Sequence, residues 1–201
     1  MSAHVIAALR IVGMLVVALI VAGCPVSLVQ PYDEKLLNDT EALFKKASAM
    51  IDDGIASSPR TDDERAGISK PPVHPAHESK FEGRYNSLAT DADALILRAI
   101  SKSKDVDPIG EKLQQKINDL IEGALPIQCE ELEGELAAAK SLTVKNYVDL
   151  RCLLVRWKAQ HSDSGLTRDT GILKRTNWEL RKAAIFSAVL AINRAEMSKA
   201  Q

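Results

Sequence analysis

Histidines and a glutamate that could ligate a metal lie together in one short stretch, His74-Pro75-Ala76-His77-Glu78. A zinc site takes three or four Cys, His or carboxylate ligands, usually from two clusters with a regular spacing. Here the ligand types fall among prolines rather than on a helix face, and no second cluster in the sequence completes a site. The pattern therefore predicts solvated loop residues, with no metal and no other cofactor.

Two cysteines, Cys129 and Cys152, could form a disulfide. If the chain turns near Lys140 and Ser141, two antiparallel helices bring them to the same height, and a bridge would contribute about 3 kcal/mol. If one helix ran straight through, they would lie about 35 Å apart at a rise of 1.5 Å per residue, which excludes a bridge. The alternatives are thus a disulfide and two small buried thiols. A catalytic thiol is not supported, because no nearby histidine is placed by the sequence to activate it.

The other polar residues form no recognisable catalytic pattern. Asp91 and Asp93 lie on different faces of their predicted helix and cannot act as a carboxylate pair. The sequence has no Gly-rich phosphate loop, nucleophile elbow or zincin motif. Its charge is nearly balanced, with 26 Lys+Arg against 27 Asp+Glu, so no basic patch argues for nucleic acid. We therefore expect neither an enzyme nor a nucleic-acid-binding protein.

The N-terminal residues have the features of an export signal. The start carries the free amino group and Arg10, and no residue from Ile11 to Val21 is charged. This run is shorter than the about 20 apolar residues that a membrane span needs, but it suits the middle region of a signal peptide. We expect residues 1–23 to be cleaved. The alternative is an uncleaved anchor helix that begins near Val5.

The apolar run closes on four residues that resemble the lipobox of bacterial lipoproteins, Val21-Ala22-Gly23-Cys24. The resemblance implies a diacylglyceryl group on the Cys24 sulfur, cleavage before this residue, and a fatty acid such as palmitate on the new amino end. Two or three acyl chains hold a protein firmly in a membrane, because each buried methylene contributes about 0.8 kcal/mol. Residues 24–31 would then be a tether in the cell envelope. Pro25 replaces the aspartate associated with inner-membrane retention, which for a Gram-negative source implies the outer membrane, facing the periplasm.

Residues 32–201 are predicted to form one helical domain. Apolar residues recur at three- and four-residue spacing, over about 33–55, 79–104, 107–124, two segments between 127 and 161, and 176–198. Helix starts are expected at five capping positions: Asp33, Ser79, Asp107, Ser141 or Thr143, and Thr176. Trp157 and Trp178 fall on apolar stripes and should lie in the core. His161 ends a predicted helix, where a protonated imidazole would suit the helix dipole.

The stretch between the first two helices loses this periodicity. Residues 56–79 contain four prolines, with Ser, Asp and Gly between them. A segment of this length and composition is either functional or disordered. We expect a flexible Pro-rich loop.

These patterns predict an all-α fold: an antiparallel helical bundle of four to five helices, with a long disordered loop and an N-terminal signal segment. The mature chain also resembles small helical envelope lipoproteins of bacteria, at Tyr32-Asp33-Glu34, Leu95-Ile96-Leu97-Arg98-Ala99 and Leu190 to Lys199. This resemblance implies a helical fold and supplies no activity.

The expected function is that of a lipid-anchored envelope protein whose non-enzymatic domain binds another envelope protein or braces the envelope. The alternative is a bundle that binds a small ligand or lipid at the membrane surface. An enzyme whose residues converge only in three dimensions is a third possibility. An exposed apolar groove over a sealed core would favour a protein partner, whereas a large apolar cavity would favour a ligand.

Overall fold

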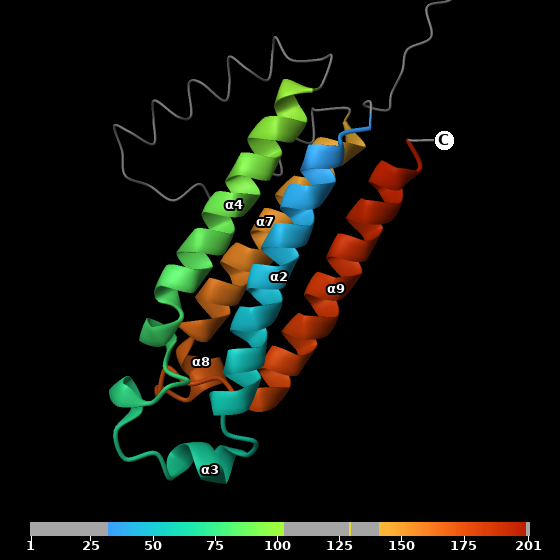
Figure 1. Cartoon of the computed structure of the whole chain (residues 1–201). Coiled ribbons are helices and arrows are strands. Elements are labelled where there is room, and N and C mark those ends of the chain that lie inside the picture. The colour runs from blue at the N-terminus through green and yellow to red at the C-terminus, as the bar shows by residue number, and fades with distance from the viewer. Residues whose placement is uncertain (1–31, 103–128, 130–140, 200–201) are drawn as a thin grey trace, which may run out of the picture.

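The computed structural model describes residues 32–102, 129 and 141–199. Its four long helices are α2 (Glu34–Ser57), α4 (Glu82–Ser101), α7 (Leu142–His161) and α9 (Arg175–Met197). The shorter elements are α3 (Asp62–Ala66), α8 (Ser164–Thr167) and the 3₁₀ turns η1 (Pro71–Val73) and η2 (Glu78–Lys80). The long helices pack antiparallel (Figure 1), which confirms the predicted all-α bundle. The predicted signal segment with Cys24, the helix at 107–124 and nearly all of 127–140 lie outside the described residues.

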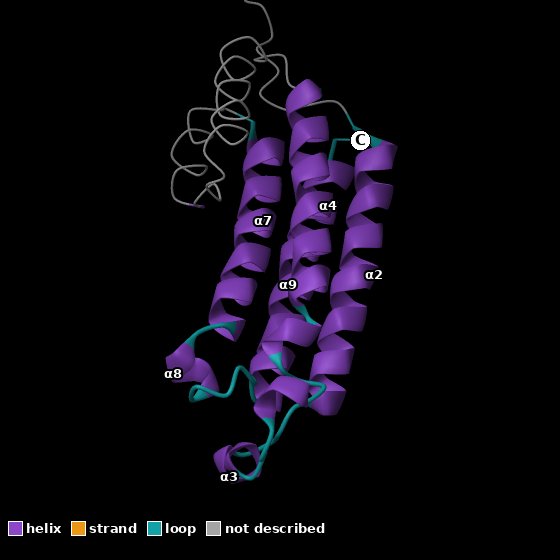
Figure 2. Cartoon of the chain, turned by 90° about the vertical axis from the view of Figure 1, so that its left-hand side faces the viewer, coloured by secondary structure: helices purple, strands orange, loops and turns teal. Residues whose placement is uncertain are grey.

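The four long helices form a closed ring around one core. Helix α2 packs against α4 and α9, and α7 completes the ring by packing against the same two helices (Figures 1 and 2). The predicted apolar stripes face inward, and the largest fully buried side chains include Trp178, Tyr147, Leu43, Met50 and Ile51. None of the helices in the described part of the chain combines the length and apolar character that a membrane span requires.

Among the predicted caps that lie within the described residues, those at Asp33 and Ser141 are confirmed. The Asp33 carboxylate accepts from Leu36 N, and the Ser141 hydroxyl accepts from Val144 N. The predicted caps at Ser79 and Thr176 are wrong. Helix α4 begins only at Glu82, because His77 Nδ1 accepts from Ser79 N at 3.2 Å and holds that residue in the turn η2.

Helix α9 begins one residue before the predicted cap at Thr176. The Arg175 amide donates to the Pro59 carbonyl at 2.9 Å, so a partner more than a hundred positions away satisfies this orphan N–H. Lys174 occupies the N-cap position and makes no side-chain capping bond. The local S/T-x-x-E pattern therefore gave the wrong start, because a long-range bond took over the capping role.

The structure also differs from the predicted flexible loop at 56–79. Helix α3 is capped by the Thr61 hydroxyl, and Arg65, only 3% exposed, donates to the carbonyls of Leu166 at 2.7 Å and Ile172 at 3.2 Å. Glu78 N donates to Gly171 O at 2.8 Å. These bonds join the segment to α8 and to the connection between α8 and α9, and no periodicity within residues 56–79 could reveal them.

Neither Cys129 nor Cys152 forms a disulfide in the structure. Cys152 lies on α7 inside the core, and Cys129 packs against that core with its side chain half-buried.

Cys152 should therefore resist alkylation in the folded protein and react once the protein unfolds. Its side chain is 1% exposed, so a maleimide cannot reach the sulfur. Peptide mass mapping without reductant, after brief maleimide treatment with and without urea, measures this protection. Equal labelling of Cys152 under both conditions would contradict its burial, and a linked Cys129–Cys152 peptide would show that the disulfide forms after all.

Candidate ligand-binding site

Six side chains form a buried cluster at the end of the bundle nearest α3 and α8 (Figure 1). The start of α4, the end of α7 and the start of α9 each contribute two of them, and none is more than 4% exposed: Phe81, Tyr85, Trp157, His161, Trp178 and Arg181. We call this group the aromatic–arginine cluster. Its rings meet at tilted or edge-on angles, with Phe81 and Trp178 centroids 4.8 Å apart and His161 and Trp178 centroids 5.2 Å apart. Such geometry adds to the stability that burial of the rings provides.

Helix α2 makes room for this cluster at Gly54. A Cβ atom at this position would lie 2.4 Å from two ring carbons of Trp178. The helix continues through Gly54 to Ser57. The glycine is therefore needed for the close approach of α2 and α9 and does not terminate the helix.

Arg181 places a cation inside the cluster. Its Nη1 donates to the Tyr85 hydroxyl at 2.6 Å and its Nη2 donates to the Trp157 carbonyl at 2.8 Å. The guanidinium carbon also lies 4.9 Å from the Trp178 ring centroid and 5.7 Å from that of Trp157. Among the described residues, no carboxylate lies within ion-pair distance of Arg181. Burial lowers the pKa of this guanidinium, but arginine stays charged in proteins.

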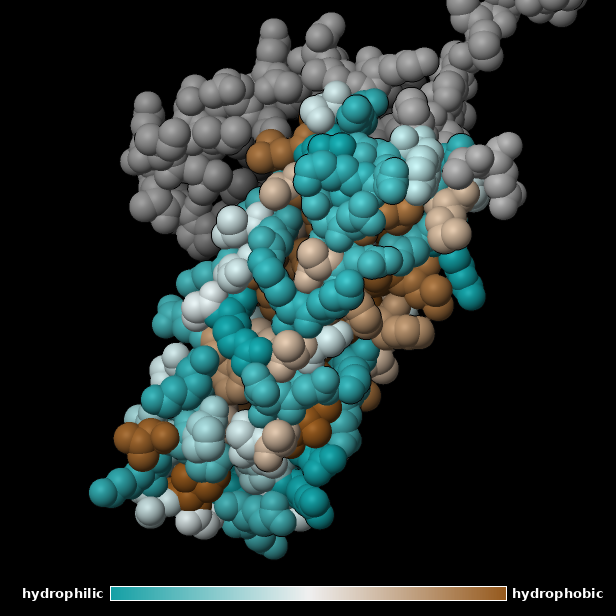
Figure 3. All heavy atoms as spheres, in the orientation of Figure 1, coloured by the Kyte–Doolittle hydropathy of each residue, from teal (hydrophilic) through white to brown (hydrophobic). Residues whose placement is uncertain are grey.

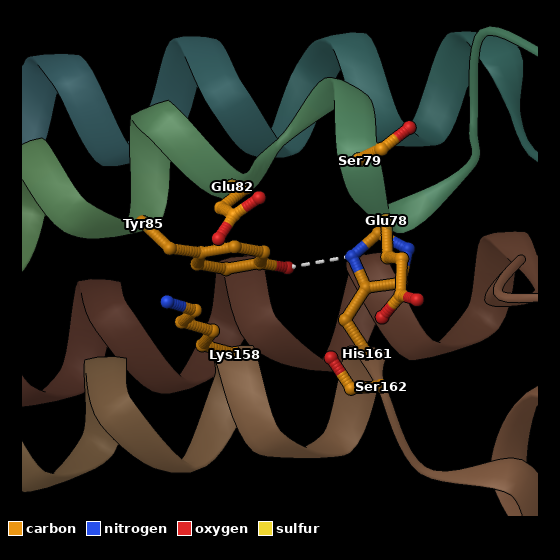
Figure 4. Close-up of a pocket in the computed structure, with 7 residues that line it drawn as sticks. All are labelled: Glu78, Ser79, Glu82, Tyr85, Lys158, His161 and Ser162. Atoms are coloured by element: carbon orange, nitrogen blue, oxygen red, sulfur yellow. Dashed lines mark hydrogen bonds between the residues drawn. The ribbon is translucent and has the colours of Figure 1, made fainter.

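His161 continues the hydrogen-bond chain. Its Nε2 lies 3.3 Å from the Ala76 carbonyl, which can only accept, so Nε2 carries the hydrogen. Its Nδ1 then accepts from the Tyr85 hydroxyl at 3.0 Å, as Figure 4 shows. The donors thus run in one direction, from Arg181 through Tyr85 and His161 to Ala76. Burial, with a smaller effect of the Arg181 charge, lowers the pKa of His161 to about 4, so the ring is neutral at pH 7.

This network is poorly suited to acid–base catalysis at neutral pH. Burial raises the pKa of Tyr85 to about 12, while that of His161 is about 4. A general acid or base works best when its pKa lies near the operating pH. Each of the hydrogen bonds joins a donor to a neutral acceptor, which orients the side chains and gives the core a fixed arrangement.

Two hollows flank the aromatic–arginine cluster. The α4/α7 pocket has a volume of about 210 Å³, and its lining is polar and apolar in about equal parts. Its lining residues are Glu78, Ser79, Glu82, Tyr85, Lys158, His161 and Ser162 (Figure 4). The α7/α9 pocket has a volume of about 250 Å³ and is more apolar; its lining residues are Trp157, Gln160, Leu166, Leu173, Asn177, Leu180, Arg181 and Ala184. The cluster therefore contacts solvent-accessible space on two sides, and Arg181 itself lines the second pocket.

Some of the residues singled out from the sequence line the pockets: Glu78, Ser79 and His161 line the α4/α7 pocket, and Trp157 lines the α7/α9 pocket. His74, Asp91 and Asp93 line neither of these two pockets. His74 Nδ1 accepts from the Ala76 amide at 3.1 Å, so this ring serves a local turn. Asp91 pairs with Lys46 on α2, whereas Asp93 pairs with Arg151 on α7, which confirms that the two carboxylates face different helices. Within the described ranges, no group of three or more His, Cys, Asp or Glu side chains is placed to hold a metal ion.

The structure corrects the prediction for His161. We expected a protonated imidazole at a helix end, but the side chain is fully buried and neutral, because burial and, to a smaller extent, the charge of Arg181 lower its pKa to about 4. The sequence analysis missed Tyr85 and Arg181 as site residues. A signal existed for Arg181: it occupies one position of the buried stripe of α9, Trp178, Arg181, Ile185, Val189 and Ile192. An arginine at a core position of a helix is rare unless it is paired.

Replacing Tyr85 with phenylalanine should destabilise the protein by about 2 kcal/mol, because it removes one hydroxyl that serves two buried partners. The Arg181 Nη1 donor and the His161 Nδ1 acceptor would both lose their hydrogen bond. Urea denaturation at pH 7 measures the loss. Tyr32→Phe is the matched control, because Tyr32 is 42% exposed and its substitution should leave the midpoint unchanged. If Tyr85→Phe unfolds at the same urea concentration as the unmodified protein, the network does not stabilise the core.

No protein-family model, curated protein or solved structure matches the chain. Its function has to be inferred from its own residues.

Proposed function

We propose that this protein is a lipid-anchored component of the bacterial cell envelope, whose helical bundle binds another envelope protein and catalyses no reaction. The resemblance of Val21-Ala22-Gly23-Cys24 to a lipobox supports the anchor. In the bundle, the mismatch of the Tyr85 and His161 pKa values with neutral pH supports a non-catalytic role.

The observation that carries the binding proposal is the exposure of large apolar side chains on α9. Leu180 is 70% exposed, Phe186 57% and Met197 60%. The side chains that α9 turns toward the core are buried, so these three are not part of the core. Hydrophobic residues along α9 lie among hydrophilic ones on the surface in Figure 3. A partner that packs along α9 would bury these side chains, as partners do at exposed apolar surfaces.

Site-specific photo-crosslinking in the envelope of the source bacterium tests the binding proposal. A photoreactive residue at Phe186 should give a discrete adduct with one other protein. Leu97 on α4 is the matched control, because its side chain is also apolar and is 50% exposed, but α4 lies across the ring from α9. The proposal fails if Phe186 and Leu97 give the same adducts, or if Leu180, Phe186 and Met197 all give none.

Cys24→Ser tests the anchor in the same cells. The substitution removes the sulfur that would carry lipid, so the protein should leave the membrane fraction and lose any labelling by an alkyne-tagged palmitate. Ser27→Ala, three residues further along the predicted tether, is the control and should change neither property. Membrane association and palmitate labelling that both survive Cys24→Ser would count against lipid tethering.

A further inference from the structure

Arg181 differs from the other buried arginine of the described chain in having no acidic partner. Arg65 is 3% exposed and forms an ion pair with Asp62, whereas Arg181 is 4% exposed and bonds only to a hydroxyl and a carbonyl. Removing a charge from water costs several kcal/mol, and proteins usually offset this cost with an opposite charge. The faces of the aromatic rings around Arg181 offset part of this desolvation cost. The positive charge of Arg181 is left without an anion among the residues that the structure describes.

The guanidinium also keeps hydrogen-bonding capacity for a ligand. It has five N–H donors in a planar fork, and the described residues accept from two of them. Arg181 also lines the α7/α9 pocket, so a molecule in this pocket lies beside this residue. A carboxylate is the anion whose planar geometry matches this fork.

The remaining lining of the pocket selects the rest of the ligand. Trp157, Leu166, Leu173 and Leu180 supply apolar surface, while Gln160 and Asn177 supply amides. A volume of about 250 Å³ admits only a small molecule or a single side chain. One cation balances one negative charge, so a monoanion with an apolar body fits this lining better than a doubly charged phosphate does.

We propose that the α7/α9 pocket binds a small apolar monocarboxylate, with the carboxylate on Arg181 and the apolar body against Trp157 and Leu180. This inference goes beyond the proposed function, because it depends neither on the lipid anchor nor on a protein partner. The pocket accepts a free organic acid or the C-terminal residue of a peptide, since both present the same carboxylate beside an apolar group.

Tryptophan fluorescence is a direct readout of binding. The chain has two tryptophans, and both rings lie beside the guanidinium of Arg181. A ligand that enters the pocket changes the surroundings of Trp157, which lines it. The full chain, solubilised in a non-ionic detergent, is titrated with 3-phenylpropionate and with its uncharged analogue, 3-phenylpropanamide.

The carboxylate should give a saturable change in fluorescence, with a dissociation constant about tenfold lower than that of the amide, because only the carboxylate pairs with the buried charge. Equal responses to the two compounds, or no saturable response to either, would overturn the proposal. A tetrapeptide ending in leucine, compared with its C-terminal amide, distinguishes a free organic acid from a peptide C-terminus as the occupant. If the tetrapeptide acid binds more tightly than 3-phenylpropionate, the occupant is a peptide C-terminus.

Variants at the rim of the pocket locate the response without disturbing the core. Replacing Arg181 would also remove a hydrogen-bond donor to Tyr85 and so disturb the core. We therefore choose Leu180→Glu, because the Leu180 side chain is 70% exposed. A carboxylate at the rim should weaken binding of 3-phenylpropionate about tenfold, because it competes for Arg181 and repels the ligand. Leu180→Gln has the shape of Leu180→Glu without its charge and loses the same apolar contact, so it should bind 3-phenylpropionate several-fold more tightly than Leu180→Glu does. Leu97→Glu places the same charge on α4 and should bind like the unmodified protein. If Leu180→Glu binds as tightly as Leu180→Gln, the ligand does not reach Arg181.

Discussion

Replacing Gly54 with alanine should destabilise the protein by about 3 kcal/mol, although alanine is the better helix former by about 1 kcal/mol. The added Cβ would lie 2.4 Å from two carbons of the Trp178 ring, and a ring in a closed core cannot move away freely. Helices α2 and α9 would have to separate. Because α9 also carries Arg181, the hydrogen bonds to Tyr85 and Trp157 would lengthen as well. Urea denaturation followed by circular dichroism measures the change.

Gly83→Ala is the matched control for this prediction. Gly83 lies in the first turn of α4, and a Cβ there would have no neighbour within 4 Å. The substitution should therefore stabilise the protein by up to about 0.5 kcal/mol, through the helix preference of alanine alone. If both variants are stabilised to a similar extent, Trp178 does not pack against α2 as described.

Lowering the pH from 6.5 to 4 should reduce the stability by up to about 3 kcal/mol through His161 alone. In the unfolded chain this imidazole takes up a proton near its ordinary pKa of 6.5, whereas in the folded protein burial lowers the pKa to about 4. Between these two pKa values the unfolded state binds more protons than the folded state, so the free energy of unfolding falls as the pH falls. Above about pH 7.5 the histidine is almost fully neutral in both states and contributes almost no slope.

His161→Gln separates this effect from other titrations. The variant cannot take up a proton at this position, so its free energy of unfolding should change less between pH 6.5 and 4.5 than that of the unmodified protein. Asp33 does not interfere, because its hydrogen bond to Arg98 lowers its pKa below 3.8, and the stability that it contributes is lost only at lower pH. Equal slopes in the two proteins would mean that His161 is not held neutral in the core.

The helical architecture could be predicted because its evidence is local. A stripe such as Leu88, Ala92, Leu95 and Ala99 on α4 repeats at helical spacing, and all four side chains are buried in the structure. The caps Asp33 and Ser141 act within three residues of themselves, so the sequence placed them correctly. The predictions for residues 56–79 and for the start of α9 failed where bonds join distant parts of the chain, as Arg65 does to Leu166 and Arg175 does to Pro59.

The candidate site could not be assembled from the sequence, because it needs the relative register of three helices. Tyr85 and His161 were visible on their stripes, but only the antiparallel packing of α4 and α7 brings the hydroxyl to the imidazole. Arg181 was visible as a charge within an apolar stripe. That it lacks an acidic partner among the described residues is a property of the packed structure alone.

Lipid attachment at Cys24 is tested most directly by mass spectrometry of the protein purified from the membranes of its source bacterium. We predict that the N-terminal peptide begins at Cys24 and carries the mass of a diacylglyceryl group, with a further fatty acid on the amino end in a Gram-negative source. A purified protein that begins at Met1 and carries no fatty acid would contradict both the anchor and the proposed place of the bundle in the cell envelope.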